Sequence, residues 1–153
     1  MTADLPHILI AEDSDNDLEL TLAALRSHRV INEVDAVRDG AEALDYLYRQ
    51  GRFVSREAKP LALVLLDLKM PKVDGLEVLR RIKSDPDLRL TPVVMLTSSR
   101  EEVDLVRSYE LGVNAYVVKP VAFGEFMEAV KQLGAFWAVL NERPHRPAGG
   151  SSA

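Results

Sequence analysis

Short apolar runs alternate with longer segments of helical periodicity along most of this chain. Five runs are candidates for strands, at residues 7–11, 33–37, 61–66, 92–96 and 114–118. Each is followed by a segment whose apolar residues recur at the three- and four-residue spacing of an amphipathic helix. Strict alternation of this kind predicts a parallel sheet with helices on both faces and right-handed crossover connections.

Capping signals and prolines suggest where the predicted helices begin and end. Asp15 or Asn16 is placed to cap the first helix, and Gly112 to cap the end of the fourth. Asp85-Pro86 should end the third, because proline disfavours a helical conformation in the residue before it. The later periodic segments cover residues 41–49, 76–82, 101–111 and 122 to about 140.

The composition excludes several classes of protein. The chain has 153 residues and no cysteine, so disulfides, thiolate metal sites and cysteine nucleophiles are ruled out. A net charge of −5 gives no electrostatic reason to expect nucleic-acid binding. The longest apolar runs are far shorter than the ~20 residues that span a bilayer. We therefore expect one cytoplasmic domain at residues 1–141 with no membrane or nucleic-acid partner, and a disordered tail at residues 142–153.

Polar side chains directly follow four of the five predicted strands. The carboxyl ends of parallel strands meet at one edge of an open sheet, which is where such folds place their sites. Three carboxylates, a hydroxyl and an ammonium group should therefore converge. These residues are Glu12 and Asp13 after the first strand, Asp67 after the third, Thr97 and Ser98 after the fourth, and Lys119 after the fifth.

This set of groups favours phosphoryl chemistry on a metal ion. Three clustered carboxylates repel one another unless a cation joins them. Oxygen ligands without histidine or cysteine favour a hard ion such as Mg²⁺. A lysine and a small hydroxyl beside that ion suit the oxygens of a phosphoryl group. The pattern predicts phosphoryl transfer with one carboxylate as the nucleophile.

Over about residues 6–140 the sequence resembles the receiver domain of two-component response regulators. This resemblance implies an α/β fold with a doubly wound, five-stranded parallel sheet of strand order 2-1-3-4-5. With no recognisable output domain after residue 140, we expect a stand-alone receiver. The matching pieces are Glu12-Asp13, Asp67 within Leu66-Asp67-Leu68-Lys69-Met70-Pro71, Asp74-Gly75, Thr97-Ser98 and Lys119-Pro120.

The resemblance also implies a phosphoryl acceptor and a set of Mg²⁺ ligands. Asp67 would accept the phosphoryl group from the phosphohistidine of a cognate histidine kinase. Asp13 and Asp67 would bind Mg²⁺ directly, and Glu12 would act through water. The backbone carbonyl of Lys69 would complete the protein ligands. The chain would assist its own phosphorylation and dephosphorylation, as a signalling receiver and not as an enzyme acting on free metabolites.

Three further residues would form the switch. Thr97 would turn its hydroxyl to the phosphoryl oxygens, and Lys119 would pair with the same group across a cis Lys119-Pro120 peptide bond. Tyr116 matches the aromatic residue that moves inward with the threonine in this family. The long connection at residues 49–60 and an aromatic end of the last helix resemble receivers paired with bacterial phytochrome histidine kinases.

The last predicted helix is apolar around much of its circumference, which favours a second partner. One seam should cover the sheet, and its residues are Phe123, Phe126, Val130, Leu133, Trp137 and Leu140. Met127, Phe136 and Val139 lie off this seam. We expect a homodimer through the face of the fourth helix, fifth strand and fifth helix. The residues expected to support this dimer are Tyr109, Leu111, Met127, Phe136, Trp137 and Leu140.

Two other functions share parts of the pattern. An aspartyl-phosphate hydrolase would want a second carboxylate two residues after Asp67, where this chain has Lys69. A flavodoxin-like flavin binder would want a loop rich in Ser, Thr and Gly after the first strand. There the run Glu12-Asp13-Ser14-Asp15 would repel the flavin phosphate.

Overall fold

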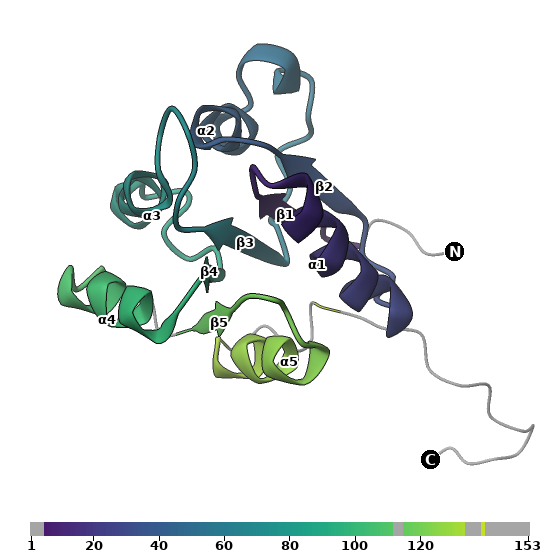
Figure 1. The fold of residues 1–153 in the computed structure, drawn as a ribbon. Coiled ribbons are helices and arrows are strands. Elements are labelled where there is room, and N and C mark those ends of the chain that lie inside the picture. Colours follow the sequence, from purple (N-terminus) through teal and green to yellow (C-terminus); the bar gives the residue numbers. More distant parts are fainter. Residues whose placement is uncertain (1–4, 112–114, 134–138, 140–153) are drawn as a thin grey trace, which may run out of the picture.

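The predicted alternation of strands and helices is present in the computed structural model, which describes residues 5–111, 115–133 and 139 (Figure 1). The strands are β1 (Ile8–Ala11), β2 (Val34–Val37), β3 (Leu63–Asp67), β4 (Val93–Thr97) and β5 (Tyr116–Val118). The helices are α1 (Asp15–Ser27), α2 (Gly40–Tyr48), α3 (Gly75–Ser84), α4 (Arg100–Ser108) and α5 (Phe123–Gln132), with a short 3₁₀ helix, η1 (Gly51–Phe53). All strand pairs are parallel, in the predicted order β2-β1-β3-β4-β5.

Two apolar cores form, one on each face of the sheet. Helices α1 and α5 cover one face, and α2, α3 and α4 cover the other (Figure 1). Successive residues of a strand point to opposite faces, so Leu63 and Leu65 join the first core while Val64 and Leu66 join the second. Burial of β1, β3 and β4 on both faces explains why these strands are almost wholly apolar.

The cap of the first helix lies one residue before the nearer of its two predicted caps. Ser14 is the N-cap, and its side chain accepts a hydrogen bond of 3.2 Å from the backbone N–H of Asp17. The prediction of Asp15 or Asn16 as the cap was wrong, because both already lie within the helix. Asp15 and Asp17 instead stand in the first turn, where negative charge favours the helix dipole.

Two helix ends also differ from the prediction. Helix α4 ends at Ser108 with Tyr109 as its cap, and Gly112 lies outside the described residues. Helix α5 ends at Gln132, capped by Leu133, which is earlier than the predicted end at about residue 140. Residues 134–138 and 140 of the predicted helix lie outside the described residues. The capping residue is followed in the sequence by Gly134, the residue type most common just after a helix end. Val139 is buried in the core beside α1 and α5.

The long connection after α2 is held by Tyr46. The Arg56 guanidinium lies 4.1 Å from the centre of the Tyr46 ring, and Arg56 Nε donates a hydrogen bond of 3.0 Å to the Tyr46 carbonyl. Phe53 meets the same ring edge-on, and the Tyr46 hydroxyl donates to Asp35 at 2.5 Å. The connection is therefore folded against the domain, at the edge of the sheet where β3 begins. Within the described part of the chain, no helix has the length and apolarity to cross a membrane.

Candidate functional site

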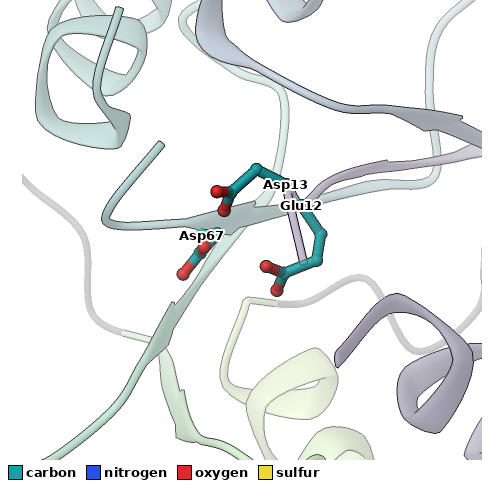
Figure 2. Close-up of side chains that lie close together, drawn as sticks. All are labelled: Glu12, Asp13 and Asp67. Atoms are coloured by element: carbon teal, nitrogen blue, oxygen red, sulfur yellow. The ribbon is translucent and has the colours of Figure 1, made fainter. Parts of the chain in front are cut away.

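Three carboxylates meet at the carboxyl edge of the sheet, as predicted. Glu12 and Asp13 follow β1, and Asp67 is the last residue of the neighbouring β3, whose Leu66 pairs with Ala11. Each offers an oxygen within 4.8 Å of the others, and Figure 2 shows the three side chains turned toward a common point. Glu12 and Asp67 are buried, whereas Asp13 is exposed. The backbone N–H of Ser14 donates to the Glu12 carboxylate at 3.2 Å and helps to hold it in place.

Lys119 supplies the positive charge at this cluster. Its ammonium lies 3.2 Å from a carboxylate oxygen of Glu12 and 3.2 Å from one of Asp67. A third contact of 2.9 Å joins it to Asp17 on α1. Burial alone would lower the pKa of Lys119, but the hydrogen bond to Asp17 and the charges of Asp67 and Glu12 raise it above its ordinary value.

The backbone fixes where this ammonium group lies. The Lys119 N–H donates a hydrogen bond of 2.8 Å to the Thr97 carbonyl and so joins the ends of β4 and β5. The Lys119-Pro120 peptide bond is cis, as the sequence analysis expected. The two strand ends therefore deliver Thr97 and Lys119 to the same edge as the three carboxylates.

The cluster carries more negative charge than its one lysine balances. Burial and the nearby charge of Glu12 raise the pKa of Asp67 to about 7, although Lys119 opposes this. An ionised carboxylate in this position is therefore costly when only Lys119 accompanies it. Oxygen ligands with a deficit of positive charge match what a hard divalent cation prefers. Glu12, Asp13 and Asp67 thus fit a metal site.

Thr97 has a buried hydroxyl group without a hydrogen-bond partner among the described residues. The side chain is fully buried at the end of β4, one residue after Leu96, which pairs with Asp67 across the sheet. An unsatisfied buried hydroxyl costs about 1–3 kcal/mol. Such a group is stabilised when an incoming oxygen accepts its hydrogen bond.

The other predicted residues take varied positions. Tyr116 is partly buried on β5, with the Arg107 guanidinium 5.1 Å from its ring centre, and burial raises the pKa of its hydroxyl. Tyr109 is 49% exposed after α4, whereas Leu111 and Met127 are partly buried against the two cores. The remaining predicted dimer residues, Phe136, Trp137 and Leu140, lie outside the described residues.

The sequence analysis missed Arg38, which holds the loop that carries two of the carboxylates. Its Nε donates to the Glu12 carbonyl at 3.1 Å, and its Nη2 donates to the Asp13 carbonyl at 3.2 Å. The same guanidinium pairs with the carboxylate of Asp15. Arg38 directly follows β2, so the strand-end rule that found the other residues also applies to it.

A family model described as the response regulator receiver domain matches residues 8–131. The chain belongs to this family. It is 41% identical over 130 residues to response regulator Rcp1 of Synechocystis sp., covering 85% of this chain and 87% of that protein. The bacteriophytochrome response regulator AtBRR is 61% identical with a TM-score of 0.87, covering 91% of this chain and 99% of that one. The Mn²⁺-bound structure of Rcp1 is 37% identical with a TM-score of 0.67, covering 92% of this chain and all (100%) of that one.

These comparisons confirm three of the predictions from the sequence. The chain is a receiver-domain response regulator with a role in two-component signalling, and it is homologous to phytochrome-associated regulators. Its sheet order is that of the receiver fold. A relative is described in a Mn²⁺-bound form, which agrees with the acidic cluster as a site for a divalent cation.

Divalent cations are expected to stabilise this receiver against heat. The cation would relieve repulsion among Glu12, Asp13 and Asp67, and it binds only where the fold brings them together. A cation present at 100 times its Kd should add ~2.7 kcal/mol to the free energy of unfolding, which raises Tm by several degrees. Calorimetry with and without Mg²⁺ or Mn²⁺ measures this rise.

The Asp13→Asn variant should lose most of this rise in Tm, because one carboxylate of the cluster becomes an amide. Asp104→Asn, which removes an exposed carboxylate on α4, should respond as the wild type does. An equal rise in all three proteins would show that the cations act elsewhere.

Proposed function

We propose that this response regulator accepts a phosphoryl group on Asp67 from a histidine kinase of the bacterial phytochrome type. The observation that carries the proposal is the position of the Asp67 carboxylate. It is buried between the acidic side chains that would hold a cation and the ammonium of Lys119, 3.2 Å away. The buried hydroxyl of Thr97 lies at the end of the next strand.

Each group would have a separate part in the transfer. Asp13 and Asp67 would bind Mg²⁺ directly, with Glu12 acting through water and the Lys69 carbonyl as a further ligand. The bound cation would neutralise charge that builds up on the phosphoryl oxygens. Asp67 would attack phosphorus as an ionised carboxylate, and the leaving group would depart on the opposite side.

Lys119 and Thr97 would then hold the new acyl phosphate. The ammonium of Lys119 already contacts Asp67 and would follow the added charge. The Thr97 hydroxyl would donate to a phosphoryl oxygen and gain the partner that it lacks. Tyr116 on the neighbouring β5 would move inward with Thr97, and this pair of movements would be the switch.

The chain would thus assist its own phosphorylation and dephosphorylation in the cytoplasm, without acting on free metabolites or on nucleic acid. The partner class follows from the relatives, since AtBRR and RtBRR are both described as bacteriophytochrome response regulators. Phosphorylation would alter a homodimer through α4, β5 and α5. Leu105 (46%) and Tyr109 (49%) are large apolar side chains exposed on this face. A monomer in sedimentation at micromolar concentration, with and without a phosphoryl mimic, would contradict the dimer.

Phosphotransfer from a kinase tests the proposed function directly. A phytochrome-type histidine kinase, labelled on its histidine and freed of nucleotide, is mixed with the wild-type chain in Mg²⁺. Label should move to this chain and should be released by hydroxylamine, because an acyl phosphate is reactive toward that nucleophile. Transfer should stop when a chelator removes the cation. Label that is absent, or that resists hydroxylamine, would contradict an aspartyl phosphate.

A further inference from the structure

Glu102, in the first turn of α4, links two strand ends that border the phosphoryl-acceptor site. One carboxylate oxygen accepts a hydrogen bond of 2.7 Å from the backbone N–H of Ser98, which follows β4. The other oxygen lies 3.1 Å from the ammonium of Lys69, two residues after Asp67. The Glu102 side chain is 13% exposed, whereas the Lys69 side chain is 77% exposed and Ser98 is exposed, so both contacts are made at the solvent-facing border of the site.

An ordinary helix cap does not account for this arrangement. In a capping box, the third helical residue returns a hydrogen bond to the N–H of the capping residue itself. The cap of α4 is Ser99, whose hydroxyl accepts from the Glu102 N–H at 3.3 Å, as in such a box. The Glu102 carboxylate, however, reaches one residue further back, to Ser98, and adds an ammonium group from a different loop.

Both groups that Glu102 contacts are suited to bind an anion on Asp67. Ser98 follows Thr97, whose buried hydroxyl has no hydrogen-bond partner in the described part of the chain, and Lys69 is two residues beyond Asp67 at the end of β3. Burial alone would raise the pKa of Glu102, but the Ser98 N–H and the charges of Lys69 and Lys119 lower it.

We propose that Glu102 competes with the phosphoryl group, holding the Ser98 N–H and the Lys69 ammonium until phosphorylation of Asp67 displaces it. This inference rests on the proposed function, because the competitor is the phosphoryl group on Asp67. A dianionic phosphoryl group offers stronger charge-assisted hydrogen bonds to the same donors and repels a nearby carboxylate. The exchange would release the Glu102 side chain, in the first turn of α4, from both of its contacts.

The exchange would couple the chemistry to α4. Release of Glu102 removes the ion pair that ties the first turn of α4 to the connection after β3. The helix would then keep its Ser99 cap and the buried Val103 but lose its tie to Lys69, and the α4–β5–α5 face would be freer to adjust. Glu102 would thereby lower the affinity of the site for a phosphoryl group and stabilise the unphosphorylated, inactive state.

Affinity for a phosphoryl mimic tests this competition. Beryllium fluoride forms a phosphoryl-like adduct on an aspartate, and calorimetric titration in saturating Mg²⁺ gives its Kd. The Glu102→Gln variant keeps the size of the side chain but loses the charge that holds Lys69. It should bind the mimic about three- to tenfold more tightly, the range for loss of a partly exposed ion pair and a hydrogen bond to a charged group.

Two further variants separate competition from a purely structural role. Glu101→Gln removes the same charge from the same turn, at an exposed position, and should stay within about twofold of wild type. Glu102→Asp keeps the charge but shortens the reach, and should also gain affinity, by less than Glu102→Gln. Its retained charge in the first turn favours folding if Glu102→Gln is too unstable to measure. The Kd for Mg²⁺ should be unchanged throughout.

The outcomes distinguish this inference from the proposed function. Equal mimic affinity for the Glu102 and Glu101 variants, with normal binding by wild type, would overturn the competition and leave the proposed function standing. Weaker binding by both Glu102 variants would overturn it as well, because Glu102 would then support the phosphorylated state. No saturable binding by wild type in Mg²⁺ would overturn the proposed function and the competition together.

Discussion

Asp67→Asn is expected to abolish phosphorylation by small phosphodonors while the domain stays folded. The amide has the size of the carboxylate but offers no nucleophilic oxygen to phosphorus. Intact mass after incubation with a phosphodonor should show one added phosphoryl group on wild type in Mg²⁺, none without it, and none on the variant. The expected change in labelling is complete loss, since the other carboxylates at the site would serve as metal ligands.

The fold should survive this change because of where Asp67 lies. Its side chain is buried beside Glu12, and burial together with that charge raises its pKa to about 7. A neutral amide removes this like-charge contact, so the variant should be at least as stable as wild type without a cation. Retention of the phosphoryl adduct in the variant would show that Asp67 is not the acceptor. A loss of folded structure would be visible in the same samples by circular dichroism.

The fold and the main residues of the site could be predicted from the sequence for one geometric reason. Parallel strands end at a common edge, so the residues that follow the apolar runs, among them Asp13, Asp67 and Lys119, are expected to lie together. The same rule should have yielded Arg38 after β2. Arg38 was missed because β2, with Asp35 inside it, has a weaker apolar pattern than the other strands.

Examining the residues that follow the strands could not identify residues that reach the site from helices. Asp17 and Glu102 both lie in first turns, where acidic residues are expected on account of the helix dipole alone. Only the folded geometry shows that one contacts Lys119 and the other Lys69. Their second role depends on how α1 and α4 are placed against the sheet, which local sequence does not encode.

At the end of α5, the helical spacing of apolar residues did not predict where the helix ends. The aromatic and aliphatic spacing continues past Gln132 in the sequence, and it favoured a helix to about residue 140. Val139 nevertheless packs into the core with Phe126 and Val130, outside the helix. The helical spacing placed Val139 off the seam that covers the sheet, whereas the structure buries it, so the pattern assigned neither its conformation nor its burial correctly.

Gly75→Ala is expected to lower the free energy of unfolding by roughly 2–4 kcal/mol, because it overfills a rigid contact beside the acceptor. Gly75 begins α3, and its N–H donates to the Leu68 carbonyl at 2.8 Å. A methyl group there would lie 2.2 Å from the backbone oxygen of Asp67 and 2.9 Å from the Leu68 Cα. Neither backbone atom can yield as a flexible side chain would, so α3 or the end of β3 must shift.

Gly124→Ala is the matched control, since a methyl group there meets no atom within 4 Å. Gly124 is the second residue of α5, and alanine is a better helix former than glycine, so this variant should be at least as stable as wild type. Urea unfolding measures both changes, and equal stability of the two variants would contradict the close contact at Gly75. Folded Gly75→Ala protein should also accept the phosphoryl group more slowly, because the backbone that must shift carries Asp67 itself.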